Sequence, residues 1–253
     1  MPDHVLVTPA KPGVVLVSLN RPERRNALSI PLLTSLTAIL SQLADDDTTR
    51  VVILAAAGPV FSAGLDLAEA ADGSLLEESA RQIKAALVAL QDHRLVTIAA
   101  VQGGAYAGGA GLMAACDLAV GADDVQIGFP EVRRGLVAAL VGDVLCAKVR
   151  KGEMAELFLL GTPIDARRAR EIGLLQRVVP AGRLLDEALA MADAVLAGGP
   201  EAIARTKVSI NTAYSDAADP LLSESHHRQA RQSDEAAEGL AAFLAKRPPR
   251  WQP

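Results

Sequence analysis

The apolar positions of this chain fall into two alternating patterns. Short runs rich in valine, isoleucine and leucine, such as Val14–Leu19, Val51–Ala56 and Leu95–Val101, are typical of buried strands. Between the runs, apolar residues recur at helical spacing, as in the segment that Ser29 can cap and that extends to about Ala44. Strands that alternate with helices predict right-handed crossovers and a largely parallel sheet, and therefore an α/β fold.

The rest of the chain follows the same patterns until its last quarter. The other predicted strands are His4–Thr8, Leu118–Val120, Val125–Gly128 and Leu175–Val179, and the other helices are Glu77–Asp92, Gly108–Cys116, Glu153–Leu160 and a segment from Asp165 to Gly173. After Pro180 the pattern is entirely helical, with predicted helices Leu184–Leu196, Glu201–Ala213 and Asp234–Ala245. This change predicts a core over residues 1–180 and a helical region over residues 181–253 that serves packing and oligomerisation.

Composition narrows the class of protein. Hydrophobic residues make up 50% of the 253 positions and aromatic residues only 3%, so we expect a core of alanine, leucine and valine. A net charge of −5 argues against nucleic acid as a partner. Cys116 and Cys146 lack metal-ligand spacing and are expected to be reduced thiols.

One stretch, Leu95–Cys116, has no charged residue and is long enough to span a bilayer. Its glycines, however, lie where a strand would turn into a helix, so we expect a buried strand, turn and helix instead. Residues 1–20 lack a basic start followed by an apolar block, the pattern of a secretory leader. We therefore expect no membrane partner and a cytoplasmic location.

Two glycine-bearing segments, Phe61–Leu67 and Gly103–Gly111, carry the strongest indication of chemistry. Each follows a predicted strand and leads into a segment of helical character. A glycine turn at a helix start leaves backbone N–H groups unpaired, and the helix dipole adds partial positive charge there. Two such turns side by side would bind an oxyanion from two directions, which indicates an enzyme that acts on an acyl group.

These segments belong to a wider resemblance to the crotonase (enoyl-CoA hydratase/isomerase) superfamily. In order along the chain, the similar segments are Leu19–Ser29, Phe61–Leu67, Gly104–Gly111 followed by Cys116–Leu118, Gly128–Val132, and Glu238–Trp251. The resemblance implies a crotonase-like spiral of ββα units with a helical C-terminal region. It also implies an acyl-CoA thioester substrate, a homotrimer or a hexamer made of two trimers, and no metal or redox cofactor, since CoA is part of the substrate.

The resemblance assigns catalytic roles to four positions. The backbone N–H groups of Leu65 and Gly108 would bind the thioester oxygen, and Glu131 would be the acid/base residue. A structural ion pair of Glu131 with a neighbouring arginine is the alternative interpretation. Many hydratases of the family carry a second glutamate at the site matching Gly111, so this chain departs from them there. A second departure is Ala138–Val141, where many members are glycine-rich, so we expect a different pocket wall.

Further residues match substrate-binding positions of the family. Arg24 or Arg25 would contact the CoA phosphates, and Ala63, Asp66 and Leu67 would lie beside the adenine. Phe243 and Lys246, three residues apart on one predicted helix face, would reach the CoA of a neighbouring subunit. The remaining predicted binding residues are Ala27, Tyr106 and Pro130.

Three functions remain compatible with these residues. Hydration of a 2-enoyl-CoA is our first hypothesis, and Tyr106, Asp66 or Asp143 could then supply a second polar group. Isomerisation of a 3-enoyl-CoA to a 2-enoyl-CoA needs only one base and is the second. An acyl-CoA-binding protein without catalysis is the third. A P-loop and a GxSxG serine-hydrolase motif are both absent from the sequence.

Overall fold

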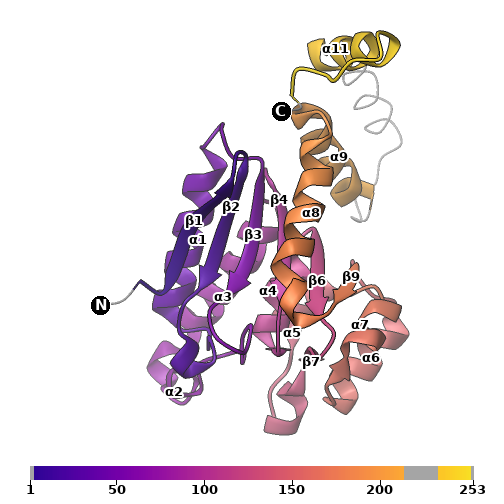
Figure 1. Ribbon diagram of the computed structural model, residues 1–253. Helices are drawn as coiled ribbons and strands as arrows, with labels where there is room; N and C mark the ends of the chain where they lie inside the picture. The colour runs from indigo at the N-terminus through magenta and orange to yellow at the C-terminus, as the bar shows by residue number, and fades with distance from the viewer. Residues whose placement is uncertain (1–2, 214–232, 252–253) are drawn as a thin grey trace.

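The computed structural model describes residues 3–213 and 233–251 and contains two sheets (Figure 1). The larger sheet has the order β1-β2-β3-β4-β6-β9, and all of its neighbouring strands are parallel except β1 and β2. The smaller sheet has the order β5-β7-β8. The strands are β1 Val5–Lys11, β2 Val14–Leu19, β3 Val51–Ala56, β4 Val96–Val101, β5 Gly104–Tyr106, β6 Leu118–Ala122, β7 Gln126–Gly128, β8 Ile164–Asp165 and β9 Arg177–Val179.

Helices cover both faces of the larger sheet. They are α1 Ile30–Ala44, α2 Leu67–Ala70, α3 Leu76–Gln91, α4 Gly108–Ala115, α5 Ala139–Leu145, α6 Lys151–Leu160, α7 Ala166–Glu171, α8 Leu184–Leu196, α9 Pro200–Ala213 and α11 Asp234–Leu244. Short 3₁₀ helices span Pro22–Arg24, Gly73–Leu75, Pro130–Arg134 and Ala181–Arg183.

The alternation along β3 shows how the sequence builds two cores. Val52 and Leu54 point into the cluster that includes α1, α3 and α4, whereas Val51 and Ile53 point into the cluster formed with α8. Because every residue from Val51 to Leu54 is buried, the strand reads as a continuous apolar run. Helix α8 begins after residue 180 and yet packs on the sheet, while α9 and α11 extend beyond it (Figure 1). The division at residue 180 stays a prediction.

The predicted parallel sheet and the main helices are confirmed, including the caps by Ser29 and Asp165. Three predictions of detail were wrong or incomplete. The second glycine segment contains the short strand β5 before its helix, because Gly104 and Tyr106 pair with β7. Strand β8 and helix α5 were not predicted. Helix α11 ends at Leu244, and Lys246 lies beyond it with φ +52°, so Lys246 is not part of the helix on which it was predicted to lie.

Over the described ranges, none of the helices has both the length and the apolar character that crossing a bilayer requires. The charge-free stretch from Leu95 to Cys116 instead contains β4, β5 and α4.

A buried histidine, His93, joins α1 to the start of β4. Its Nδ1 accepts the backbone N–H of Leu95 at 3.1 Å, so Nε2 carries the proton and donates to the carbonyl of Leu40 at 2.9 Å. Burial lowers the pKa of His93 below its ordinary value of 6.5, and the charge of Lys207 acts in the same direction. A second proton at Nδ1 would break the hydrogen bond to Leu95. The neutral form is therefore the form that the fold stabilises.

We expect the free energy of unfolding to fall as the pH decreases below about 6.5, because the unfolded chain then binds a proton at His93 that the native state resists. A His93→Asn variant keeps an oxygen that can accept the Leu95 N–H but does not titrate. It should be less stable at neutral pH and lose less stability on acidification. Urea unfolding at several pH values measures this, with His4→Asn as the control. Equal pH dependence in wild type and His93→Asn would contradict it.

Candidate active site

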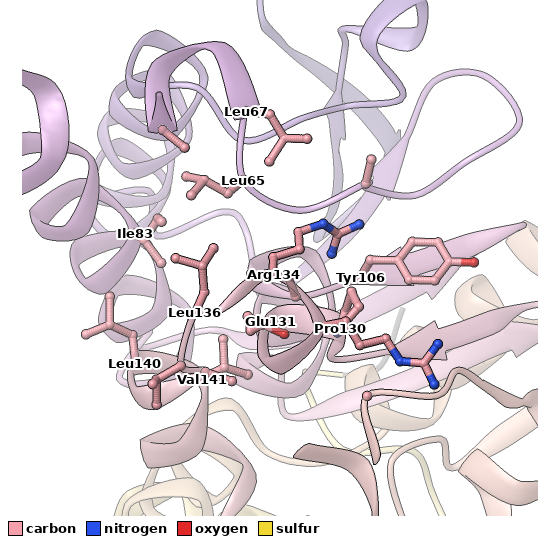
Figure 2. A pocket seen from close by; sticks show the side chains of 18 of the residues that line it. Leu65, Leu67, Ile83, Tyr106, Pro130, Glu131, Arg134, Leu136, Leu140 and Val141 are labelled. Carbon is pink, nitrogen blue, oxygen red and sulfur yellow. The ribbon is translucent and has the colours of Figure 1, made fainter. Parts of the chain in front are cut away.

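A cavity of about 860 Å³ opens where the two glycine-bearing segments approach each other. Most of its wall comes from residues 60–70, the first turns of α3, residues 103–108 and residues 130–141, and Arg25, Gly161 and Pro163 complete it. Figure 2 shows Glu131 between an apolar side, with Ile83, Leu136, Leu140 and Val141, and an opposite side with Tyr106 and Pro130. The cavity therefore combines an apolar wall with one carboxylate at its centre.

The buried side chain of Asn26 fixes the loop that leads to the first glycine segment. Its Oδ1 accepts the N–H of Arg21 at 2.8 Å, and its Nδ2 donates to the carbonyls of Ala57 and Val60 at 2.9 and 2.8 Å. The hydroxyl of Ser62 donates to the carbonyl of Asn26 at 2.8 Å. Three of these hydrogen bonds attach residues 57–62 to the turn before α1, and the fourth, from the Arg21 N–H, lies within that turn.

Leu28 then sets the direction of the Leu65 backbone. The N–H of Leu28 donates to the carbonyl of Gly64 at 2.8 Å, and its carbonyl accepts the N–H of Asp66 at 3.2 Å. In this parallel bridge the N–H of Leu65 points away from Leu28. Leu65 lines the cavity, and its N–H donates to no other group among residues 3–213 and 233–251. It is available to a ligand.

The second N–H donor belongs to Gly108, the first residue of α4. Ala107 precedes it with φ +51° and ψ −125°, a strained conformation for a residue with a side chain. The N–H of Ala107 donates to the carbonyl of Gly128 at 2.8 Å, which holds this conformation. Gly108 is buried at the cavity, and its N–H has no acceptor in the described part of the chain. A β-carbon at Gly108 would lie 3.1 Å from Leu28.

The two segments approach so closely that glycine is required at the contact. Gly64 has φ +88°, and a β-carbon there would lie 2.7 Å from the carbonyl oxygen of Tyr106. A β-carbon at Gly103, with φ +61°, would lie 2.0 Å from the carbonyl oxygen of Pro59. The prediction that both N–H groups lie at helix N-termini needs correction. Gly108 begins a helix, whereas Leu65 lies in an extended bridge two residues before α2.

Glu131 lies in the first turn of the 3₁₀ helix Pro130–Arg134 and lines the cavity. Its Oε2 atom is buried and has no hydrogen-bond partner within the described residues. Burial raises the pKa of Glu131, and the charge of Arg134 opposes that shift only partly. Arg133 donates instead to the carbonyl of Leu160 and the hydroxyl of Thr162. Among the described residues, Glu131 forms no ion pair with Arg133 or Arg134, so the alternative of a structural ion pair is not supported.

Gly111 is on α4, one turn after Gly108, but it does not form part of the cavity wall. A β-carbon at Gly111 would lie 3.0 Å from the Val141 side chain and 3.3 Å from that of Leu87. Val141 itself lines the cavity. The space that a longer side chain at position 111 would need is therefore filled by Val141.

The structure brings most of the predicted site residues together. Those that line the cavity are Arg25, Ala63, Leu65, Leu67, Tyr106, Gly108, Pro130 and Glu131. Those outside the cavity wall are Arg24, Ala27, Asp66, Gly111 and Lys246, and the side chain of Phe243 lies outside the described part of the structure.

Asp66 and Glu69 have structural contacts that the sequence did not indicate. The carboxylate of Asp66 pairs with Arg21 at 3.1 Å and caps α2 through the N–H of Ala68. Glu69 lines the cavity, but its Oε2 accepts the N–H of Ile30 at the start of α1 at 2.8 Å. Asp66 is thus engaged in holding the loop, and Glu69 is not a free carboxylate like Glu131. Over the described ranges, no cluster of histidine, cysteine and carboxylate side chains could hold a metal ion.

Comparisons with known proteins show which family this chain resembles. The family model described as enoyl-CoA hydratase/isomerase matches residues 10–253. A Thermus thermophilus protein, whose name assigns it provisionally to the enoyl-CoA hydratases, is 38% identical over 97% of this chain and 100% of its own. The human mitochondrial enoyl-CoA hydratase domain-containing protein 3 is 33% identical over 94% of this chain and 80% of its own. The crystal structure of enoyl-CoA hydratase from Bacillus anthracis superposes with a TM-score of 0.93 at 32% identity, covering 98% and 99% of the two chains.

Replacing Asn26 with alanine should lower the free energy of unfolding by about 2–3 kcal/mol, because it leaves two backbone carbonyls and one N–H without partners in a part-buried position. Asn20→Ala is the matched control, since Asn20 also donates to a backbone carbonyl, that of Asp3, but in an exposed position. Its effect should stay within about 0.5 kcal/mol. Chemical denaturation of both variants checks the prediction, which a wild-type midpoint for Asn26→Ala would refute.

Glu131→Gln should raise the free energy of unfolding at neutral pH. The native pKa of Glu131 lies above its ordinary value of 4.5, so the unfolded chain releases this proton first, and wild type loses stability as the pH rises through the native pKa. The neutral glutamine does not incur this loss. The difference between the two proteins should therefore narrow as the pH falls below 4.5. Denaturation curves from about pH 4 to pH 8 measure it. A gap that widens on acidification would reverse the sign and exclude a raised pKa.

Proposed function

This chain belongs to the enoyl-CoA hydratase/isomerase family, and we propose that it adds water to the double bond of a 2-enoyl-CoA thioester. The observation that carries this proposal is the buried, unpartnered Oε2 of Glu131 in a cavity that also presents the free N–H groups of Leu65 and Gly108. A base without a partner and two unpaired donors on one cavity form a site for proton transfer next to a carbonyl.

In the proposed reaction, the two N–H groups bind the thioester oxygen and Glu131 first accepts and then donates a proton. The thioester oxygen accepts hydrogen bonds from the N–H groups of Leu65 and Gly108, which stabilise negative charge as it develops. The oxygen of a water molecule adds to C3 of the substrate. One proton of this water stays on the new hydroxyl, and the other passes to the carboxylate of Glu131. The electron pair of the double bond moves onto the thioester as an enolate. Glu131 then returns the proton to C2, so that one water has been added and the carboxylate is regenerated.

The environment of Glu131 suits this double role. A carboxyl group with a raised pKa holds its acquired proton more firmly than an ordinary glutamate and is a stronger base when deprotonated. Backbone donors suit the oxyanion because they depend on no side chain, and losing one such donor in other enzymes costs about 3–4 kcal/mol of transition-state stabilisation. Proton transfer alone accounts for the reaction, so we propose no cofactor beyond the CoA of the substrate.

The CoA moiety is proposed to lie along Arg25, Ala63 and Leu67, which form one wall of the cavity. Arg24 is exposed next to Arg25 and could reach a phosphate outside the cavity. We further propose the homotrimer or hexamer implied by the resemblance, in which Phe243 and Lys246 of one subunit would contact CoA bound to another.

Isomerisation of a 3-enoyl-CoA is a second candidate, favoured by the contact between Gly111 and Val141. Position 111 is a glycine with Val141 beside it, so α4 supplies no second carboxylate there to hold a water. Isomerisation requires no water: Glu131 takes a proton from C2, the enolate forms at the same pair of N–H groups, and the proton returns to C4. The two reactions thus share every group and differ only in whether water reaches C3.

Incubation with 2-enoyl- and 3-enoyl-CoAs, analysed by mass spectrometry, separates the candidates. Hydration adds the mass of water to a 2-enoyl substrate, whereas isomerisation converts a 3-enoyl substrate at constant mass. In either case Glu131→Gln should reduce kcat/KM by about 10²–10⁴-fold. As the pH falls, the wild-type kcat/KM should begin to decrease at a pH above 4.5, because the raised pKa of Glu131 means that its carboxylate is protonated there. Glu171→Gln, at an exposed glutamate of α7 that pairs with Arg167, is the matched control. Binding of acyl-CoA without turnover of any substrate would replace both candidates by a binding protein.

A further inference from the structure

The apolar side of the cavity contains one hydroxyl, on Ser79 of α3. Helix α3 lines the cavity with Leu76, Ser79, Ala80 and Ile83, and residues 136–141 face it with leucine, valine and alanine. Figure 2 places the labelled members of this wall on the side of Glu131 that lies away from Tyr106. An apolar wall is expected to bind an aliphatic chain, so a hydroxyl in this wall is unexpected unless it binds a polar group of the ligand.

The hydroxyl of Ser79 lacks the hydrogen bond that other helical hydroxyls of this chain make. Ser35 and Thr37 on α1 and Ser209 on α9 each donate to the carbonyl four residues earlier, at 2.8, 2.9 and 2.9 Å. Ser79 makes no such bond, and no other described residue hydrogen-bonds to its hydroxyl. The side chain is nevertheless buried, with an exposed fraction of 6%. Ser79 lines the cavity, so its hydroxyl can bind a group held there.

The hydroxyl of Ser79 has no partner among the described residues, and a valine or alanine at this position would suit an alkyl chain better. The charge around Ser79 narrows what its partner can be. The parts of α3 and of residues 136–141 that line the cavity carry no charged residue, whereas the cations of the wall, Arg25, Arg133 and Arg134, come from other segments. An uncharged oxygen needs no cation beside it and therefore suits this part of the wall.

We propose that Ser79 is a specificity-determining residue that hydrogen-bonds an uncharged oxygen, a hydroxyl or a carbonyl, on the acyl chain of the substrate. The substrate class is then an oxygen-bearing acyl-CoA rather than a plain alkyl one. This rests on the proposed use of the cavity for an acyl-CoA. A site built around such a hydrogen bond discriminates against the analogue that lacks the oxygen, because the protein hydroxyl then stays unpaired.

Binding measurements with saturated acyl-CoAs test this without turnover. The probes are acyl-CoAs of one medium chain length that carry a hydroxyl or an oxo group at successive carbons beyond C3, together with the unsubstituted parent. We expect wild type to bind one of the oxygen-bearing probes about three- to tenfold more tightly than the parent. Ser79→Ala should lose that preference by weakening only the oxygen-bearing probe. Alanine is a good helix former, so α3 should stay intact.

Two controls keep the result specific. Ser35→Ala removes a hydroxyl that is already bonded within α1, away from the cavity, and should retain the wild-type preference. Glu131→Gln should also retain it, because the preference concerns binding. Equal affinity of wild type for every probe and the parent, or an equal change for all probes in Ser79→Ala, would overturn the inference. Preference without any turnover of enoyl-CoAs would instead leave the inference standing and remove the proposed hydration.

Discussion

The buried amide of Asn26 is the interaction on which the site depends. Two hydrogen bonds from its Nδ2 tie the turn before α1 to the loop after β3, although the joined residues lie more than thirty positions apart. A third, from the N–H of Arg21 to its Oδ1, closes the turn itself. The adjoining backbone bridge from Leu28 then fixes Gly64, Leu65 and Asp66 in one direction. Through these bonds the segment that carries the Leu65 N–H is attached to the turn before α1 and to the loop after β3.

Two features of the site are unfavourable for the stability of the native state. Ala107 holds a strained backbone conformation so that α4 can begin at Gly108 with its N–H toward the cavity. The Oε2 of Glu131 is buried without a partner. Each of these costs destabilises the native state by an amount on the order of 1–3 kcal/mol in other proteins. They occur together at one cavity, which is where a functional site is expected to conflict with the requirements of folding.

The sequence allowed the sheet and the main helices to be predicted because buried strands and amphipathic helices leave long periodic patterns. Val51–Ala56 and the helix capped by Ser29 are examples. Strand β8 has only two residues, and β5, Gly104–Tyr106, contains none of the β-branched residues that are typical of strands. Glu131 could be predicted only through a resemblance. The supporting roles of Asn26 and the cavity-facing hydroxyl of Ser79 could not, because each depends on contacts or missing contacts that only the folded chain defines.

The two halves of the cavity are built from different groups. One half presents backbone N–H groups, and the other presents side chains. On one side, the backbone N–H groups are fixed by Leu28, Asn26 and the α4 terminus, and in the proposed reaction they would bind the oxygen that every acyl-CoA possesses. On the other side lie side chains of α3 and residues 136–141, which would contact the acyl group. The Val141 contact at Gly111 belongs to this second half. In the proposed reaction, stabilisation of the enolate would therefore depend on backbone geometry, whereas the choice between water and no water, and between acyl chains, would depend on side chains. We therefore expect changes in the second half to alter the reaction without disturbing the first.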